Sequence, residues 1–231
     1  MNIATLHTMK IAFLYTLEAN KVLFHPYIDQ YLADKSVTIS HHVNEQLLKQ
    51  AMADGLTSNV VNLVQREVQE IALTGADIII CTCSTIGDAA EQTMDITARV
   101  IRVDRPMAEN AVLNSSIHVL AALESTIEPT LKLLEQCAKQ LKQSPAITCD
   151  VIPGAWKYYA DGDTVSYAKA IAKHIEHNDF PGDSIILAQA SMAPAIQYIE
   201  QGSVPILSSP ALCCQYLSKI VPSHDYTKSS K

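Results

Sequence analysis

Residues 77–87 read DIIICTCSTIG, an apolar run that ends abruptly in two cysteines, three hydroxyl side chains and a glycine. A short, continuous apolar run is typical of a strand that is buried on both faces of a parallel sheet. Residues 183–192 read DSIILAQASM and follow the same pattern 106 or 107 positions later. The two stretches therefore predict two buried strands, each of which leads into a polar turn.

Other apolar runs along the chain have the same strand-like character and alternate with segments of helical periodicity. The predicted strands are residues 10–15, 36–43, 77–82, 99–104, 116–123, 146–152, 183–189 and 204–209. Apolar side chains fall on one face of helices predicted at residues 57–76, 128–143 and 164–178. This alternation predicts an α/β fold with parallel sheets covered by helices.

The order of the segments suggests a duplication. Residues 11–20 resemble 117–126, 77–85 resemble 183–192, and 100–108 resemble 204–212, while 36–43 and 145–152 fall in the same order. Four pairs at a nearly constant offset predict two similar Rossmann-like halves, related by a pseudo-twofold axis, with a cleft between them. We expect the first half at 1–110, the second at 111–209, and a last helix at 210–222 that packs back on the first half.

Composition excludes several functional classes. The 231 residues carry a net charge of -7 and no basic stripe, so no nucleic-acid partner is expected. The N-terminus lacks the pattern of a signal peptide, and no apolar run approaches the ~20 residues of a membrane helix. We therefore expect a cytoplasmic protein without a membrane partner. Seven glycines without a G-x-G-x-x-G motif give no support to a dinucleotide site.

The six cysteines are expected to be thiols. Residues 81 and 83 are separated by one residue and residues 213 and 214 are adjacent, which fits neither the usual zinc spacing nor a redox pair. No metal site is therefore expected. Cys81 lies inside the apolar run and is expected to be core, as are Cys137 and Cys149. Cys83 stands just past the strand end and is the candidate functional thiol.

Polar residues follow the strands where a ligand would bind, because open α/β sheets bind ligands at the carboxyl ends of their strands. Unpaired N–H groups at the start of a helix favour anions, both a bound carboxylate and a thiolate. Helix capping is an equally good explanation for several of the hydroxyl and amide side chains. The candidates are Thr16, Glu18, Asn20, Cys83, Ser84, Thr85, Ser125, Thr126, Gln189 and Ser191.

Three segments together resemble the aspartate/glutamate racemase superfamily, which includes hydantoin racemases, maleate isomerases and arylmalonate decarboxylases. They are IIICTCSTIG (78–87), VIRVDRPMAENAV (100–112) and IILAQASMA (185–193). The resemblance implies an enzyme without a cofactor that acts on a small carboxylate, and a homodimer. In the superfamily two cysteines, one from each half, face each other across the substrate.

The resemblance also implies roles for individual residues. Cys83 matches the first-half cysteine, and Ser84 and Thr85 match the carboxylate-binding positions after it. Ser125 and Thr126 match the anion-binding loop of the second half. Thr16 and Asn20 match the equivalent loop of the first half. These roles imply that the loops of both halves hold the carboxylate.

The second-half cysteine is missing. An offset of 106 from Cys83 leads to Gln189, and an offset of 107 leads to Ala190. Neither side chain exchanges a proton at neutral pH. His42, Glu18 and Asp104 are therefore candidates for a second base, although Asp104 could instead form a surface ion pair with Arg105.

We expect a racemase or isomerase that acts at the carbon α to the carboxylate of an amino acid or small dicarboxylic acid, with Cys83 as acid/base. Two alternatives stay open. One is a single-thiol decarboxylase or lyase of the arylmalonate type, although those enzymes keep the second-half cysteine. The other is a carboxylate-binding protein without catalytic activity.

Overall fold

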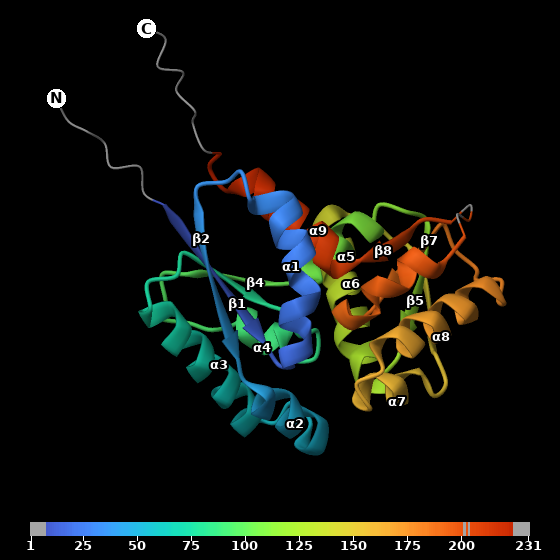
Figure 1. The fold of residues 1–231 in the computed structure, drawn as a ribbon, viewed down its shortest axis with the longest axis horizontal. Coiled ribbons are helices and arrows are strands. Elements are labelled where there is room, and N and C mark those ends of the chain that lie inside the picture. The colour runs from blue at the N-terminus through green and yellow to red at the C-terminus, as the bar shows by residue number, and fades with distance from the viewer. Residues whose placement is uncertain (1–7, 201, 203, 224–231) are drawn as a thin grey trace, which may run out of the picture.

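The computed structural model describes residues 8–200, 202 and 204–223, which form two four-stranded parallel sheets (Figure 1). The strand orders are β2-β1-β3-β4 and β6-β5-β7-β8. Every predicted strand is present to within two residues at each end, which confirms the α/β prediction. The strands are β1 (Met9–Tyr15), β2 (Val37–Val43), β3 (Ile78–Cys81), β4 (Arg99–Arg102), β5 (Ser116–Ala121), β6 (Ala146–Val151), β7 (Ser184–Leu187) and β8 (Ile206–Ser208).

Helices connect the strands, and the four predicted ones are present as α3, α6, α8 and α9. No helix in the described part of the chain is long and apolar enough to cross a bilayer. The helices are α1 (Glu18–Leu32), α2 (Glu45–Asp54), α3 (Ser58–Leu73), α4 (Gly87–Glu91), α5 (Arg105–Ala111), α6 (Ile127–Leu141), α7 (Ala155–Ala160), α8 (Thr164–Glu176) and α9 (Ser209–Ile220), with 3₁₀ segments η1 (Glu124–Thr126) and η2 (Ala190–Tyr198).

The strand registers confirm the duplication. Ile11 of β1 pairs with Ile78 of β3, and Ile117 of β5 pairs with Ser184 of β7, so both partners are shifted by 106 residues. The sheet register places the residues of β8 106 positions after their equivalents in β4, the same shift as for the other strands. The predicted match of residues 100–108 with 204–212 is therefore wrong by two positions within the strands. Helices α5 and α9 nevertheless begin 104 residues apart, since β8 runs directly into α9 whereas two residues separate β4 from α5.

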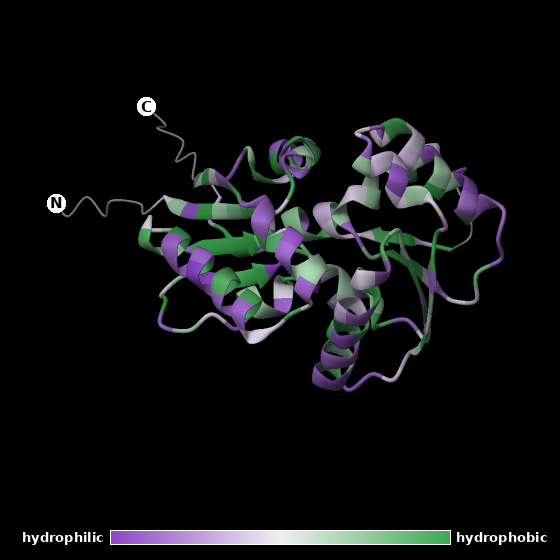
Figure 2. Ribbon diagram, turned by 90° about the horizontal axis from the view of Figure 1, so that it is seen from below, coloured by the Kyte–Doolittle hydropathy of each residue, from purple (hydrophilic) through white to green (hydrophobic). Residues whose placement is uncertain are grey.

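Each sheet is covered on both faces, as its continuous apolar strands require. In the first half, Val64 and Val68 of α3 pack on one face and Phe24 of α1 packs on the other. In the second half, Leu134 of α6 and Ile171 of α8 do the same. Figure 2 shows the apolar strands inside and the polar residues on the outer sides of the helices.

The last helix of each half packs across onto the other half. Helix α5 follows β4, but its Met107 belongs to the core cluster of the second half, with Leu134. Helix α9 follows β8, but its Leu217 belongs to the core of the first half, with Phe24; α9 lies beside α1 in Figure 1. This exchange joins the two halves through buried apolar contacts and sets how their strand ends face each other.

One core prediction is wrong. Cys149 lies on β6, an edge strand whose residues are almost all exposed, and its thiol is exposed as well. An edge strand is covered by fewer neighbours than a central one, and this strand carries charged and hydroxyl side chains. Cys137 on α6 is fully buried, as predicted.

Candidate active site

A cavity of about 40 Å³ lies where the strand ends of the two halves meet. By the same measure one water needs about 10–15 Å³, so the cavity holds a group of only a few atoms. Eight of the predicted site residues line it, whereas Ser125 is exposed and is not part of the lining. The lining consists of Thr16, Leu17, Asn20, Leu48, Thr82, Cys83, Ser84, Thr85, Leu123, Thr126, Trp156, Gln189, Ala190 and Ser191.

The sheet register carries these residues to the cavity. The N–H of Thr82 donates to the carbonyl of Leu14 at 3.0 Å, and the N–H of Ala188 donates to that of Leu120 at 2.9 Å. The two bonds are equivalent under the 106-residue shift and extend each ladder by one position past β3 and β7. Cys83 and Gln189 are the next residues, so they occupy equivalent places in the two halves.

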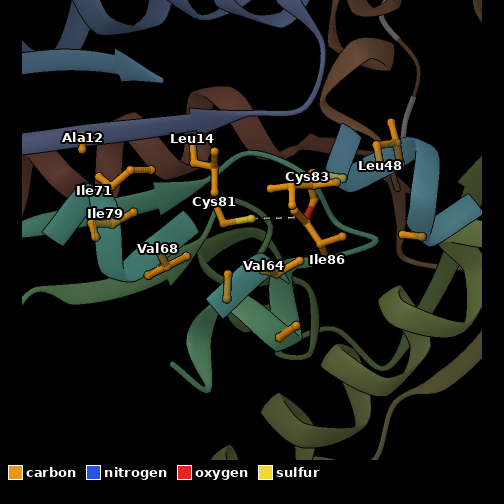
Figure 3. Close-up of a cluster of buried hydrophobic side chains, with 14 of the residues drawn as sticks. Ala12, Leu14, Leu48, Val64, Val68, Ile71, Ile79, Cys81, Cys83 and Ile86 are labelled. Carbon is orange, nitrogen blue, oxygen red and sulfur yellow. Dashed lines mark hydrogen bonds between the residues drawn. The ribbon is translucent and has the colours of Figure 1, made fainter. Parts of the chain in front are cut away.

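Both cysteines of the opening stretch belong to one buried cluster of the first half (Figure 3), but of the two only Cys83 also lines the cavity. Cys81 is fully buried in the apolar cluster between β1 and α3, and this burial raises the pKa of its thiol. Its Sγ lies 3.7 Å from the carbonyl oxygen of Cys83. Cys83 retains 8% exposure and lines the cavity, as does Leu48 of α2. Cys83 is therefore the thiol that a ligand can reach.

Three hydroxyl groups of the lining donate to main-chain carbonyls. Thr82 donates to Leu14 at 3.0 Å, and Thr126 donates to Leu123 at 2.7 Å. Ser84 donates to Ala188 at 3.0 Å, a bond that crosses between the halves. In this arrangement these protons are engaged within the protein, so the donors for a carboxylate have to come from other groups.

Two amide side chains of the lining are held by their oxygen atoms. The hydroxyl of Tyr159 donates to Oδ1 of Asn20 at 2.7 Å, and the N–H of Ala122 donates to Oε1 of Gln189 at 2.7 Å. Burial raises the pKa of Tyr159 to about 12, so this phenol remains a neutral donor. Because each amide oxygen is already engaged, the NH₂ group of each side chain is turned away from that contact.

Sequence analysis did not identify the residues that close the cavity from the side. Leu48 comes from α2, which follows β2, and Trp156 comes from α7, which follows β6. Tyr159 lies one turn after Trp156 and bridges to the first half through Asn20. The prediction placed the substrate-binding candidates at the ends of the first and third strands of each half, and took only candidate bases from the second and fourth strands of the first half. The usable signal was that the second strand of each half also ends at this edge.

None of the three candidates for a second base lines this cavity. His42 lies beside a different hollow and is within 3.1 Å of the hydroxyl of Ser40. Glu18 points to solvent and pairs with Lys21 at 3.7 Å. Asp104 is fully buried in an ion pair. No charged or imidazole side chain belongs to the described lining, where Cys83 is the one ionisable group.

The predicted surface ion pair between Asp104 and Arg105 is wrong. Asp104 accepts hydrogen bonds from Nε and Nη2 of the buried Arg102 at 2.7 and 2.8 Å, and Arg105 pairs with Glu91 instead. Burial alone would lower the pKa of Arg102, but the charge and hydrogen bonds of Asp104, together with the charge of Glu91, raise that pKa above its usual value. Arg102 also reaches the carbonyl of Ser84 at 3.4 Å, so the pair supports the turn that carries Cys83.

Several solved structures share this fold over nearly the whole chain. A glutamate racemase isoform from Bacillus anthracis matches with a TM-score of 0.67 and 20% identity, over 93% of this chain and 82% of its own. An aspartate racemase from Picrophilus torridus matches with a TM-score of 0.63 and 14% identity, over 91% of this chain and 94% of its own.

A third match extends the comparison beyond racemases. Arylmalonate decarboxylase matches with a TM-score of 0.53 and 11% identity, over 92% of both chains. No protein-family model matches this sequence, and no curated protein sequence does. The chain therefore has the fold that these glutamate and aspartate racemases share with arylmalonate decarboxylase.

Proposed function

We propose that this protein is an enzyme that works without a cofactor and transfers a proton at the carbon α to a carboxylate, with Cys83 as its acid/base. The observation that carries the proposal is that Cys83 is the one ionisable side chain in the described cavity lining. Glutamate, aspartate and arylmalonate are the substrates in the names of the neighbouring structures, which supports a small carboxylate as the ligand.

The proposed step uses a general acid/base. In the racemase or isomerase direction, the Cys83 thiolate takes the α-proton, the C–H bond breaks, and its electron pair moves onto the carboxylate as an enediolate. The Cys83 thiol then returns a proton to the same carbon, which restores the C–H bond and the carboxylate and regenerates the thiolate. Inversion at the α-carbon requires that the proton returns from the face opposite the one from which Cys83 removed it. The second-half residue equivalent to Cys83 is Gln189, whose amide cannot supply that proton.

Because the described lining of the cavity holds no second acid/base, a decarboxylase is the second candidate. In that direction the C–C bond to one carboxylate breaks, carbon dioxide leaves, and the electron pair remains as an enediolate on the other carboxylate. The Cys83 thiol then delivers one proton to the α-carbon and recovers a proton from solvent. A single thiol suffices, and it protonates the carbon from one face.

Isotope exchange and gas release separate the two candidates. The protein is incubated in D₂O with a panel of amino acids and dicarboxylic acids, and α-deuteration is followed by NMR. Substituted malonates are assayed for carbon dioxide release. We expect activity in one panel, and its loss in Cys83→Ala and Cys83→Ser.

Cys149→Ala is the matched control, because this second thiol is exposed and lies outside the cavity lining. It should retain full activity. Turnover that survives Cys83→Ala would show that the assignment of Cys83 is incorrect. Carboxylate binding without turnover in either panel would instead identify a binding protein.

A further inference from the structure

The amide of Gln189 is held in one orientation. Its Oε1 accepts from the N–H of Ala122 at 2.7 Å, and a main-chain N–H can only donate. The oxygen therefore has to face Ala122, and Nε2 has to face away from it. Ala122 follows β5 directly, so the side chain bridges two neighbouring strand ends of the second half.

The Nε2 group of Gln189 is a buried donor without a hydrogen-bond partner in the part of the chain that the structure describes. The residue is 8% exposed. Four other buried side-chain atoms there also lack a hydrogen-bond partner, on Thr93, His118, Thr130 and Ser209, although Nε2 of His118 lies 3.3 Å from a carboxylate oxygen of Asp150; none of these residues lines the cavity. An unsatisfied buried donor destabilises the folded protein, so its retention at a cavity wall points to an acceptor that arrives with a ligand.

Three other side-chain donors of the lining are already bonded within the protein, so the free donor of Gln189 matters for a ligand. No Lys, Arg or His belongs to the described lining, and the hydroxyl protons of Thr82, Ser84 and Thr126 go to carbonyl groups. A carboxylate in this cavity has to be held by neutral groups whose protons are still available. The NH₂ of Gln189 is such a group, and its fixed oxygen means that little rotational freedom is lost when it binds.

We propose that Nε2 of Gln189 donates a hydrogen bond to a carboxylate oxygen of the ligand, from the second-half wall that corresponds to the position of Cys83 in the first half. The inference rests on the proposed function and assigns the second wall of the same site. During proton transfer at the α-carbon, negative charge grows on that oxygen, and a fixed neutral donor stabilises it without taking part in the proton transfer. Gln189 is thus a substrate-binding residue in the place equivalent to the first-half thiol.

Direct binding tests this role without any turnover. Acetate and propionate are titrated into the Cys83→Ser protein, and the dissociation constants are measured from ¹H–¹⁵N chemical shifts. The serine background removes the thiol and its ionisation. Gln189→Met keeps the length of the side chain and removes the donor, and we expect it to weaken binding about 10- to 100-fold, the range for a hydrogen bond to a charged group.

Gln189→Glu provides a readout that a purely structural role would not produce. One oxygen of the new carboxyl group can still accept from Ala122, while the other replaces the donor. Burial favours the protonated form, whose O–H can donate to a ligand carboxylate, and the ionised form repels it. We expect near-parental binding at pH 6 and strong weakening by pH 9, against a flat profile for the parent.

Gln140→Met, on the exposed surface of α6, is the matched control and should leave binding unchanged. Thermal unfolding of each variant reports any loss of folding. If Gln189→Met leaves the affinity unchanged but lowers the melting temperature, the amide only holds Ala122 in place. That result would overturn the inference about Gln189 and leave the proposed function standing. If neither the wild-type protein nor the Cys83→Ser protein binds acetate or propionate, the proposed function is overturned as well.

Discussion

Replacement of Asp104 by Asn is expected to cost about 3–5 kcal/mol of unfolding free energy. Arg102 is 1% exposed and Asp104 is fully buried, and two hydrogen bonds of 2.7 and 2.8 Å join them. Removal of one partner from such a pair leaves an uncompensated charge in the interior, which carries a penalty of that size. The loss is a large part of the roughly 5–15 kcal/mol that holds a domain folded.

The double variant Arg102→Met with Asp104→Leu separates charge from packing. Apolar residues that fill the place of a buried ion pair are often neutral or stabilising, so the double variant should recover most of the loss. The Asp104 side chain makes no capping bond to α5, and its replacement therefore removes no helix cap. Lys49→Ala, which breaks an exposed pair of 3.4 Å with Glu45, should cost less than about 0.5 kcal/mol.

Urea unfolding followed by circular dichroism measures these differences as shifts in midpoint at constant slope. A loss below about 1 kcal/mol in Asp104→Asn would refute the reasoning. The same proteins test whether Asp104 acts as a second base. A double variant that folds normally and retains turnover would show that Asp104 is not a second base.

Three further predictions follow from single contacts. Tyr159→Phe removes the bond to Asn20 that crosses the cleft, and we expect a loss of about 0.5–1.5 kcal/mol and faster exchange of protected amides at the cavity rim by hydrogen exchange. Burial lowers the pKa of His118, so the unfolded chain takes up a proton more readily than the folded one and stability should fall as pH drops from about 7.5 to 5; His118→Gln should flatten this dependence in urea titrations. Gly87→Ala places a Cβ 2.9 Å from Nε of the buried Arg102, and a melting temperature lowered by several degrees is expected, whereas an unchanged value would show that Arg102 can move aside.

Much of the fold was readable from the sequence, because the relevant patterns are local. A strand buried on both faces has to be continuously apolar, as residues 78–81 are, and an amphipathic helix such as residues 58–73 has to carry its apolar side chains at helical spacing. The duplication was readable because both halves repeat these patterns in one order. Helix α1 escaped prediction, since Pro26 lies inside it and its apolar face is weakly marked.

The partners of the polar side chains were decided only by the tertiary structure. The hydroxyl of Ser84 meets a carbonyl 104 residues away, and the amide of Gln189 meets an N–H 67 residues away. No periodicity encodes such contacts, because they depend on how the two halves face each other and on the exchange of α5 and α9. The sequence by itself determined that a thiol follows β3 and that the equivalent place after β7 holds an amide. The tertiary structure decided that both line one cavity, that Asp104 is engaged elsewhere, and that the NH₂ of Gln189 has no hydrogen-bond partner in the described part of the chain, because burial and long-range hydrogen bonds act only between groups that folding has brought together.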